Sequence, residues 1–215
     1  LCARNTGIGA DGVLYGPFFN AKGLPEVRIF NSDGSEAEKS GNGIRIFARY
    51  LRDCGAAPEK TFTIATLSGE TAVSLGEGEL VSADMGAVTF SSAAVPVTGP
   101  DREIIAEPIT LENNTFRFTA LNIGIPHCVV FCGEVSPQLA RRFGPHLETH
   151  PMFPRKTNVQ FARAVSRDRL EIQIWERGSG YTLASGSSSC AAVAAGRKLG
   201  LLGDSVSVVM PGGTV

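Results

Sequence analysis

The sequence predicts an α+β protein of two structurally related lobes, residues 1–90 and 91–215. Short β-type runs outnumber the helical segments in both halves. Two of the helical segments directly follow a loop of Gly and Ser residues, one in each half of the chain. A polar, Pro-containing stretch over residues 91–107 separates the halves and predicts their boundary. The order strands, Gly/Ser loop, helix, strands therefore occurs twice.

The composition excludes several classes of protein. Hydrophobic residues make up 43% of the 215 residues, which rules out disorder. The 20 basic and 21 acidic side chains give a net charge of −1, without the basic excess of a nucleic-acid-binding surface. No apolar run approaches the ~20 residues that span a bilayer. Five cysteines and no secretory leader predict a cytoplasmic protein. The chain starts without Met, and we expect a fragment with both termini missing.

The first lobe is expected to place one helix among strands. An amphipathic helix is predicted over residues 44–53, because apolar residues recur there every three to four positions. Gly55 and Pro58 supply its end. Strands are predicted over residues 26–30, 61–66, 70–74 and 80–84.

The second lobe is expected to hold two helices. Ser136 followed by Pro137 is typical of a helix start. A second helix is predicted over residues 190–199, ended by Gly200, and its richness in Ala and Val indicates a buried, central position. Strands are predicted over residues 115–120, 128–131, 159–165 and 170–175. The last two flank a tight turn and form a hairpin.

Two motifs resemble functional signatures that their context does not support. Residues 7–12 fit G-x-G-x-x-G, but a dinucleotide site needs a strand before this motif and a helix after it. Neither is predicted there, so a Gly-rich turn is favoured. Residues 185–189 offer serines, but they lack the G-x-S-x-G pattern of a nucleophile elbow. A serine hydrolase stays a minority interpretation.

The histidines and cysteines do not predict a metal site. His127 and two nearby cysteines lack a recognisable zinc spacing such as C-x₂-C. Pro145 and Pro151 are expected to disrupt any helix that would align His146 with His150. A buried cysteine in a core strand is the favoured interpretation of Cys128, and no metal is expected.

The paired Gly/Ser loops indicate an anion site. The first turn of a helix presents N–H groups and a partial positive charge. Two such turns in corresponding places suggest two helix N-termini that converge on one carboxylate or phosphate. No Walker lysine follows either loop, which favours a carboxylate. Polar residues at strand ends and turns add to this, since Arg can pair with a second carboxylate: Asn31, Asn158, Glu176 and Arg177. Together they predict a site for a small, zwitterionic dicarboxylate.

These motifs resemble the diaminopimelate epimerase family. The matching segments are residues 1–14, 29–50, 124–131, 156–168 and 175–196, in the family's order. The resemblance implies two lobes, each a mixed sheet around a central helix, with the site in the cleft between them. It also implies inversion of one α-carbon of LL-diaminopimelate to the meso isomer, in lysine biosynthesis, without a cofactor. One cysteine removes the α-proton and a second, on the opposite face, donates one. We expect that such a chain can form a homodimer.

The resemblance assigns roles residue by residue. The catalytic positions are Ser40 and Ser185. The backbone donors to the reacting carboxylate are Gly41, Asn42, Gly186 and Ser187. The residues that hold the distal end of the substrate are Asn31, Asn158 and Arg177. The groups that polarise the catalytic pair are Glu176, which borders the substrate, and His127 in support.

Serine at both catalytic positions is the main departure from the family, which has cysteine there. A thiol titrates near 8.5 and is readily lowered at a helix N-terminus, whereas a serine hydroxyl is a far weaker acid. Serine would need a neighbouring base, His127 or Glu176. We therefore predict little or no epimerase activity. The two serines could be engineered or natural, and Ile125, where the family has a substrate-contacting Asn, favours natural divergence, as do Ser188 and Ser189. A silent carboxylate- or amino-acid-binding homologue and a racemase of another amino acid remain alternatives.

Overall fold

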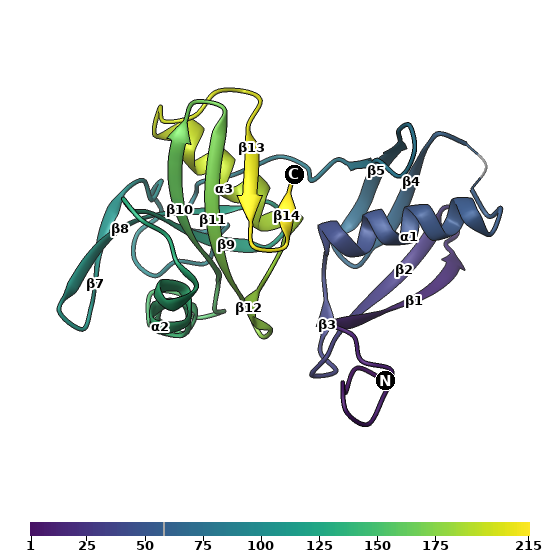
Figure 1. The fold of residues 1–215 in the computed structure, drawn as a ribbon, viewed down its shortest axis with the longest axis horizontal. Coiled ribbons are helices and arrows are strands. Elements are labelled where there is room, and N and C mark those ends of the chain that lie inside the picture. Colours follow the sequence, from purple (N-terminus) through teal and green to yellow (C-terminus); the bar gives the residue numbers. More distant parts are fainter. Residues whose placement is uncertain (58) are drawn as a thin grey trace. The chain divides into compact units, whose positions relative to one another are not determined.

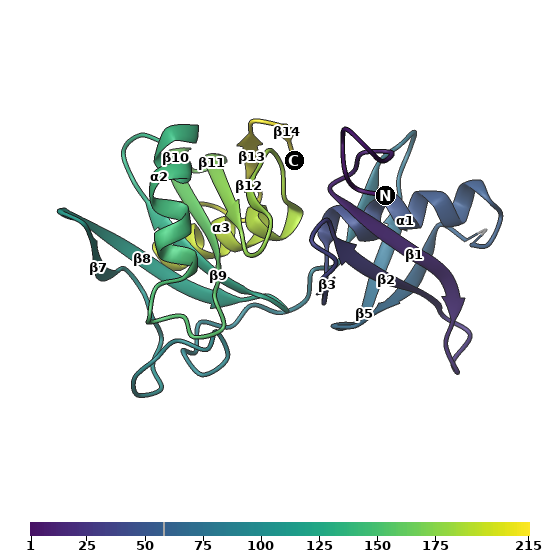
Figure 2. The ribbon, with the colours of Figure 1, turned by 90° about the horizontal axis from the view of Figure 1, so that it is seen from below.

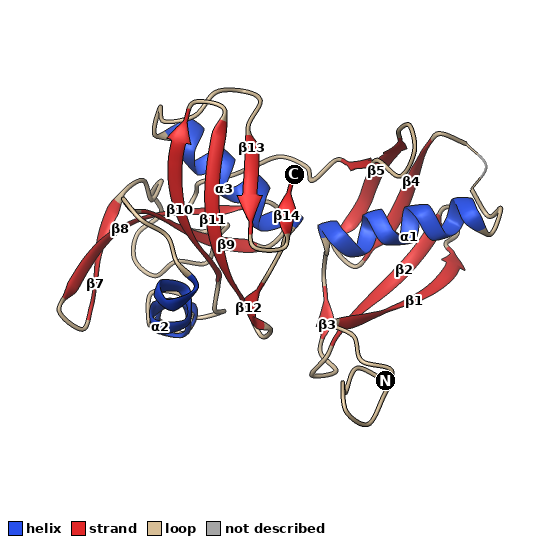
Figure 3. Cartoon of the chain, in the orientation of Figure 1, coloured by secondary structure: helices blue, strands red, loops and turns tan. Residues whose placement is uncertain are grey.

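The computed structural model describes residues 1–57 and 59–215, and this part divides into two compact units, Leu1–Gly86 and Ala87–Val215. The division lies four residues before the boundary expected from the sequence. Each unit contains a mixed sheet that packs against one or two helices (Figures 1 and 3). None of the described helices is long and apolar enough to cross a bilayer.

The first unit packs one helix on a six-stranded sheet, counted over its described residues. Its elements are β1 (Gly12–Phe19), β2 (Pro25–Asn31), β3 (Glu36–Ala37), α1 (Gly41–Asp53), β4 (Thr61–Thr66), β5 (Gly69–Leu75) and β6 (Val81–Ala83). The strand order is β1-β2-β4-β5-β6, with β3 beside β2. Only the β2–β4 pair among these is parallel. Ile44, Phe47 and Leu51 of α1 are buried in one core cluster with Val27 and Ile64 of the sheet.

In the second unit, helices cover both faces of the sheet. Its elements are β7 (Glu107–Leu111), β8 (Asn114–Asn122), β9 (Pro126–Phe131), α2 (Pro137–Glu148), β10 (Asn158–Ser166), β11 (Arg169–Glu176), β12 (Gly180–Thr182), α3 (Gly186–Lys198), β13 (Ser207–Met210) and β14 (Gly213–Thr214). The order is β14-β13-β11-β10-β9-β8-β7, with β12 beside β11. Along β9, Val130 belongs to the core cluster under α2 and Val129 to the cluster under α3. The two helices therefore lie on opposite faces (Figure 2).

The two units share one supersecondary pattern. An antiparallel hairpin, β1–β2 or β10–β11, is followed by a short strand on its second member, β3 or β12. A serine then caps a 13-residue helix, and the next strand, β4 or β13, runs parallel to β2 or β11. The same spacing of 145 residues separates Ser40 from Ser185 and Gly55 from Gly200. The predicted α+β fold with two structurally related lobes is confirmed.

Several predicted elements have different limits in the structure. α1 begins at Gly41 and α3 at Gly186, each three to four residues before the predicted start, because a serine at the N-cap lets the Gly/Ser loop join the first turn. The helix stop predicted at Pro58 lies outside the described residues. Pro145 does not interrupt α2, contrary to expectation, but the helix ends at Glu148, before His150, so α2 does not align His146 with His150. Strand β1, directly after the G-x-G-x-x-G motif, agrees with the rejection of a dinucleotide site.

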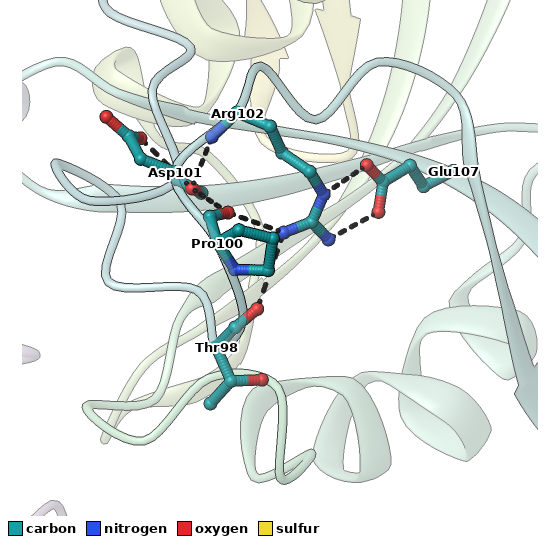
Figure 4. Close-up of polar contacts among 6 residues, drawn as sticks. Thr98, Pro100, Asp101, Arg102 and Glu107 are labelled. Carbon is teal, nitrogen blue, oxygen red and sulfur yellow. Dashed lines mark hydrogen bonds and ion pairs between the residues drawn. The ribbon is translucent and has the colours of Figure 1, made fainter.

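The polar stretch expected to separate the lobes belongs to the second unit. Val95, Val97 and Ile104 are buried in its core. Arg102 organises the stretch: its Nε and Nη2 donate to the Glu107 carboxylate at 2.8 and 2.7 Å, and its Nη1 donates to the carbonyls of Thr98 and Pro100 (Figure 4). A chain segment that reads as a linker is thus anchored to the start of β7.

Candidate active site

The N-terminus of α1 is built on Ser40. This residue is extended, with φ −141° and ψ 115°, and its Oγ accepts a hydrogen bond from the Gly43 N–H at 3.1 Å. A Cβ at Gly43 would lie 2.9 Å from Leu14 Cδ2 and 3.2 Å from Ser40 Oγ, so the glycine lets the cap close. Arg45 donates from Nη2 to Asn42 Oδ1 at 2.6 Å and from Nε to the Gly41 carbonyl at 3.3 Å. Arg45 was not singled out from the sequence, although its i, i+3 spacing from Asn42 could have indicated it.

The N-terminus of α3 repeats this construction on Ser185. The residue is extended, with φ −153° and ψ 121°, and 4% exposed. Its Oγ lies 3.2 Å from Ser187 Oγ and accepts from the Ser188 N–H at 3.4 Å. Ser189 Oγ donates to the Ser185 carbonyl at 2.9 Å. The first turn of α3 therefore gathers four hydroxyl groups at the positive end of the helix dipole.

Three polar side chains lie on the face of the sheet that α3 covers. His127 of β9 pairs in register with Asn158 of β10, and Gln160 follows two positions later on the same face. All three side chains are buried. Gln160 donates from Nε2 to Ser188 Oγ at 3.0 Å, which joins β10 to the first turn of α3. Gln160 was not singled out from the sequence, although its alternation with Asn158 along a strand could have indicated it.

His127 is neutral in this environment. It is wholly buried, and neither ring nitrogen has a hydrogen-bond partner of good geometry among residues 1–57 and 59–215. The pKa of His127 is lowered to about 3, mainly by burial; the Gln160 side chain acts in the opposite direction, and the positive charge of Arg177 adds to the lowering. An imidazole with this pKa is a weak base, so it holds a serine proton poorly.

Glu176 is the last residue of β11 and Arg177 the first of the turn that follows, and both are half-buried. Asn158 fixes this turn: its Oδ1 accepts from the Arg177 backbone N–H at 3.0 Å, and its Nδ2 donates to the Pro126 carbonyl at 3.0 Å. These bonds leave Asn158 one further N–H and one further lone pair for a ligand. In the second unit the structure thus brings together His127, Asn158, Arg177 and the Ser185 cap.

Asn31 ends β2 in the first unit. Its Nδ2 donates to Ser35 Oγ at 3.0 Å and its backbone N–H to the Ser35 carbonyl at 2.8 Å. Asn31 lines an open cavity of about 590 Å³, together with Tyr15 of β1 and the N-terminal Cys2. The amide is therefore half-buried and lies beside a space that could admit part of a ligand.

Comparison with known proteins decides the family. The family model described as diaminopimelate epimerase matches residues 1–91 and 119–215. A protein of Nostoc sp. named diaminopimelate epimerase 2 is 52% identical over the whole chain, which spans 76% of that relative. The diaminopimelate epimerase of Pelotomaculum thermopropionicum is 39% identical over 99% of the chain and 77% of its own length. The chain belongs to the diaminopimelate epimerase family.

Solved structures of other proteins share the fold of this chain. A hydroxyproline epimerase from Agrobacterium vitis, with bound trans-4-OH-L-proline, superposes with a TM-score of 0.65 over 95% of the chain at 18% identity. A probable proline racemase from Agrobacterium radiobacter superposes with a TM-score of 0.64 over 96% of the chain at 14% identity. The chain spans 65% and 66% of these two proteins. At such identities the likeness concerns the fold.

Two of the five cysteines, Cys128 and Cys132, are unsuited to proton transfer. Cys128 is wholly buried in β9, as expected for a core strand, and burial raises its pKa far above its usual range. Burial also raises the pKa of Cys132 to about 11. Both thiols are protonated at neutral pH and therefore poor nucleophiles. Among the described residues, no three His, Cys, Asp or Glu side chains gather closely enough to hold a metal ion.

Proposed function

We propose that this chain is a diaminopimelate epimerase-type isomerase whose proton transfer is impaired. It binds LL- and meso-diaminopimelate, and the interconversion of the two is slow or absent. The single observation that carries this proposal is the repeated helix N-terminus: Ser40 and Ser185 occupy equivalent caps, 145 residues apart, in the two units of a protein of this family.

The two helix N-termini suit the reacting carboxylate. Each first turn offers N–H groups at the positive end of the helix dipole, and Gly41 and Gly186 carry no side chain that would keep a ligand away from the backbone. Stabilising negative charge that develops on this carboxylate lowers the barrier to removing the α-proton. Neither Asn42 nor Ser187 adds an anionic group beside it.

The distal end of the substrate is assigned to the polar residues at strand ends. The guanidinium of Arg177 can bind a second carboxylate with two parallel hydrogen bonds. Asn158 retains one N–H for the same group, and Asn31 supplies an amide from the first unit. Glu176 is suited to an ammonium group, since it carries the opposite charge. Ile125, half-buried after β8, offers no polar contact.

The proton transfer is the impaired step. A catalytic base must be deprotonated before it can remove the α-proton, and a serine hydroxyl needs a neighbour to take its proton. Among the described residues, Ser185 Oγ contacts the Ser187 hydroxyl and the Ser188 N–H, and Ser40 Oγ accepts from the Gly43 N–H. None of these accepts a proton at neutral pH. His127 is a poor acceptor because of its low pKa.

Exchange of the substrate α-proton tests the proposal. LL-diaminopimelate is incubated in D₂O with the unsubstituted chain and with the Ser40→Cys/Ser185→Cys variant, and the α-proton signal is followed by NMR. We expect binding without exchange for the unsubstituted chain and clear exchange for the double variant. The single variants Ser40→Cys and Ser185→Cys are matched controls, since each restores a thiol on one side only.

The outcomes separate the alternatives. Binding of diaminopimelate by the double variant without exchange would indicate a silent binding homologue. Exchange of another amino acid, but not of diaminopimelate, would indicate a different racemase. Robust exchange by the unsubstituted chain would contradict the proposal that a serine hydroxyl is too weak an acid for this proton transfer. The absence of a cofactor, the homodimer and the cytoplasmic location stay predictions.

A further inference from the structure

Glu148 is a buried carboxylate that none of the roles above uses. It is the last residue of α2 and 7% exposed. Its Oε2 accepts from Trp175 Nε1 at 2.7 Å, and its Oε1 accepts from the Gly178 backbone N–H at 3.2 Å. Lys156 Nζ lies 3.7 Å from the same Oε1. A buried carboxylate is retained only where such partners compensate its desolvation.

The partners of Glu148 surround the turn that carries Arg177. Trp175 precedes Glu176 and Arg177, and Gly178 follows them. Glu148 thus holds the turn on both sides, while Asn158 holds the Arg177 N–H from the sheet. Four consecutive residues are fixed by two side chains from different elements.

The rest of α2 reinforces this attachment beside β11 and β12 (Figure 1). Gly144 lies one helical turn before Glu148, and a Cβ there would come within 2.6 Å of Trp175 Cβ and Cγ. The helix backbone therefore lies directly against the indole. The Arg141 guanidinium lies 4.1 Å from the centroid of the Tyr181 ring in β12. These α2 residues pack against one side of the β11–β12 hairpin.

We propose that Glu148 is a positioning residue that sets the place of the Arg177 guanidinium for the distal carboxylate of the substrate. This inference rests on the proposed function, because it takes Arg177 as the distal carboxylate's partner. Glu148 itself touches no substrate. It acts by accepting from Trp175 and Gly178, so that the turn between them has one conformation before a ligand arrives.

The variant Glu148→Gln tests this. Glutamine keeps one acceptor oxygen and replaces the other with an NH₂ group, so one of the two hydrogen bonds must be lost. Trp175 is the only tryptophan, so the indole N–H gives one unambiguous NMR signal. We expect that signal to shift, or the Gly178 amide to exchange with solvent about tenfold faster or more. The control Glu112→Gln removes an exposed ion pair to Arg142 of the same helix and should change neither.

Binding gives the readout that a merely structural role would not move. L-Lysine lacks the distal carboxylate of diaminopimelate. In Glu148→Gln, the affinity for diaminopimelate should fall about tenfold or more, while that for L-lysine changes little. A general loss of stability would lower both alike.

Each outcome decides the inference. An unchanged indole signal together with unchanged Gly178 exchange would overturn it, and so would equal losses for the two ligands. Unchanged affinity for diaminopimelate despite a mobile turn would overturn it as well. If the unsubstituted chain does not bind diaminopimelate at all, the proposed function is wrong, whatever the role of Glu148. The positioning of the turn is then decided by the amide exchange at Arg177 and Gly178 alone.

Discussion

His127 shows how burial alone can decide a residue's chemistry. A histidine next to a serine-capped helix suggests a general base, but this ring is wholly buried, and neither of its nitrogens has a hydrogen-bond partner of good geometry in the described part of the chain. Its pKa of about 3 makes the neutral form dominant over the whole physiological range. A neutral imidazole can still orient a neighbouring group or accept a hydrogen bond.

The low pKa of His127 predicts a pH dependence of stability. In the unfolded chain His127 titrates near 6.5, so below that pH the unfolded state binds a proton that the folded state does not. Its contribution to the free energy of unfolding is complete above pH 6.5 and is lost as the pH falls toward 3. Between pH 7 and pH 5 the loss should be about 2 kcal/mol. Urea unfolding at several pH values measures it.

The variant His127→Gln isolates this contribution, since carboxylates and His150 titrate in both proteins. The unfolding free energy of the unsubstituted chain minus that of the variant should decrease as the pH falls. A difference that is constant with pH would show that His127 is protonated in the folded state as readily as in the unfolded one.

Among the elements, α2 depends on one glycine. Gly144 is helical, and a methyl group there would meet Trp175 Cβ and Cγ at 2.6 Å, atoms held by the β11 backbone. Overpacking of this kind typically costs ~1–3 kcal/mol. Alanine gains ~1 kcal/mol in helix propensity, which does not offset a clash that the sheet cannot relieve. We expect Gly144→Ala to lower the free energy of unfolding, measured by circular dichroism in urea.

A matched control for Gly144→Ala exists in the loop before α2. A Cβ at Gly133 would meet nothing within 4 Å, and the residue has no positive φ. Gly133→Ala should be neutral or slightly stabilising, since it restricts only the unfolded chain. Equal effects of the two substitutions would contradict close packing between α2 and Trp175.

Local patterns predicted the elements better than their limits. The hairpin β10–β11 follows from two alternating runs around a polar turn, and the start of α2 follows from Ser136 and Pro137. The starts of α1 and α3 were placed too late because Gly and Ser have low helix propensity, whereas the N-cap hydrogen bonds extend the helices into them. The run through Pro145 is a tertiary effect, since Phe143 and Leu147 are buried on either side.

For the molecule as a whole, the sequence identified the family, because motif segments hold their order along the chain, while its assignment of site residues stays a prediction. The partners of Gln160 and Glu148 could not be read from the sequence, since they lie 28 and 27–30 residues away. Such contacts depend on strand register and on which face of α2 meets the sheet. Neither follows from local spacing.

The second unit should fold without the first. Each core cluster draws its buried residues from one unit: one cluster from the first, and two, on either face of the sheet, from the second. A unit with its own core can fold alone. We therefore expect residues 87–215, expressed alone, to unfold cooperatively with heat and to keep the Trp175 emission of the full chain. The emission is a direct test, because this single tryptophan lies between α2 and the Arg177 turn. Noncooperative unfolding, or emission typical of an exposed indole, would show that residues 1–86 are needed to form the second core.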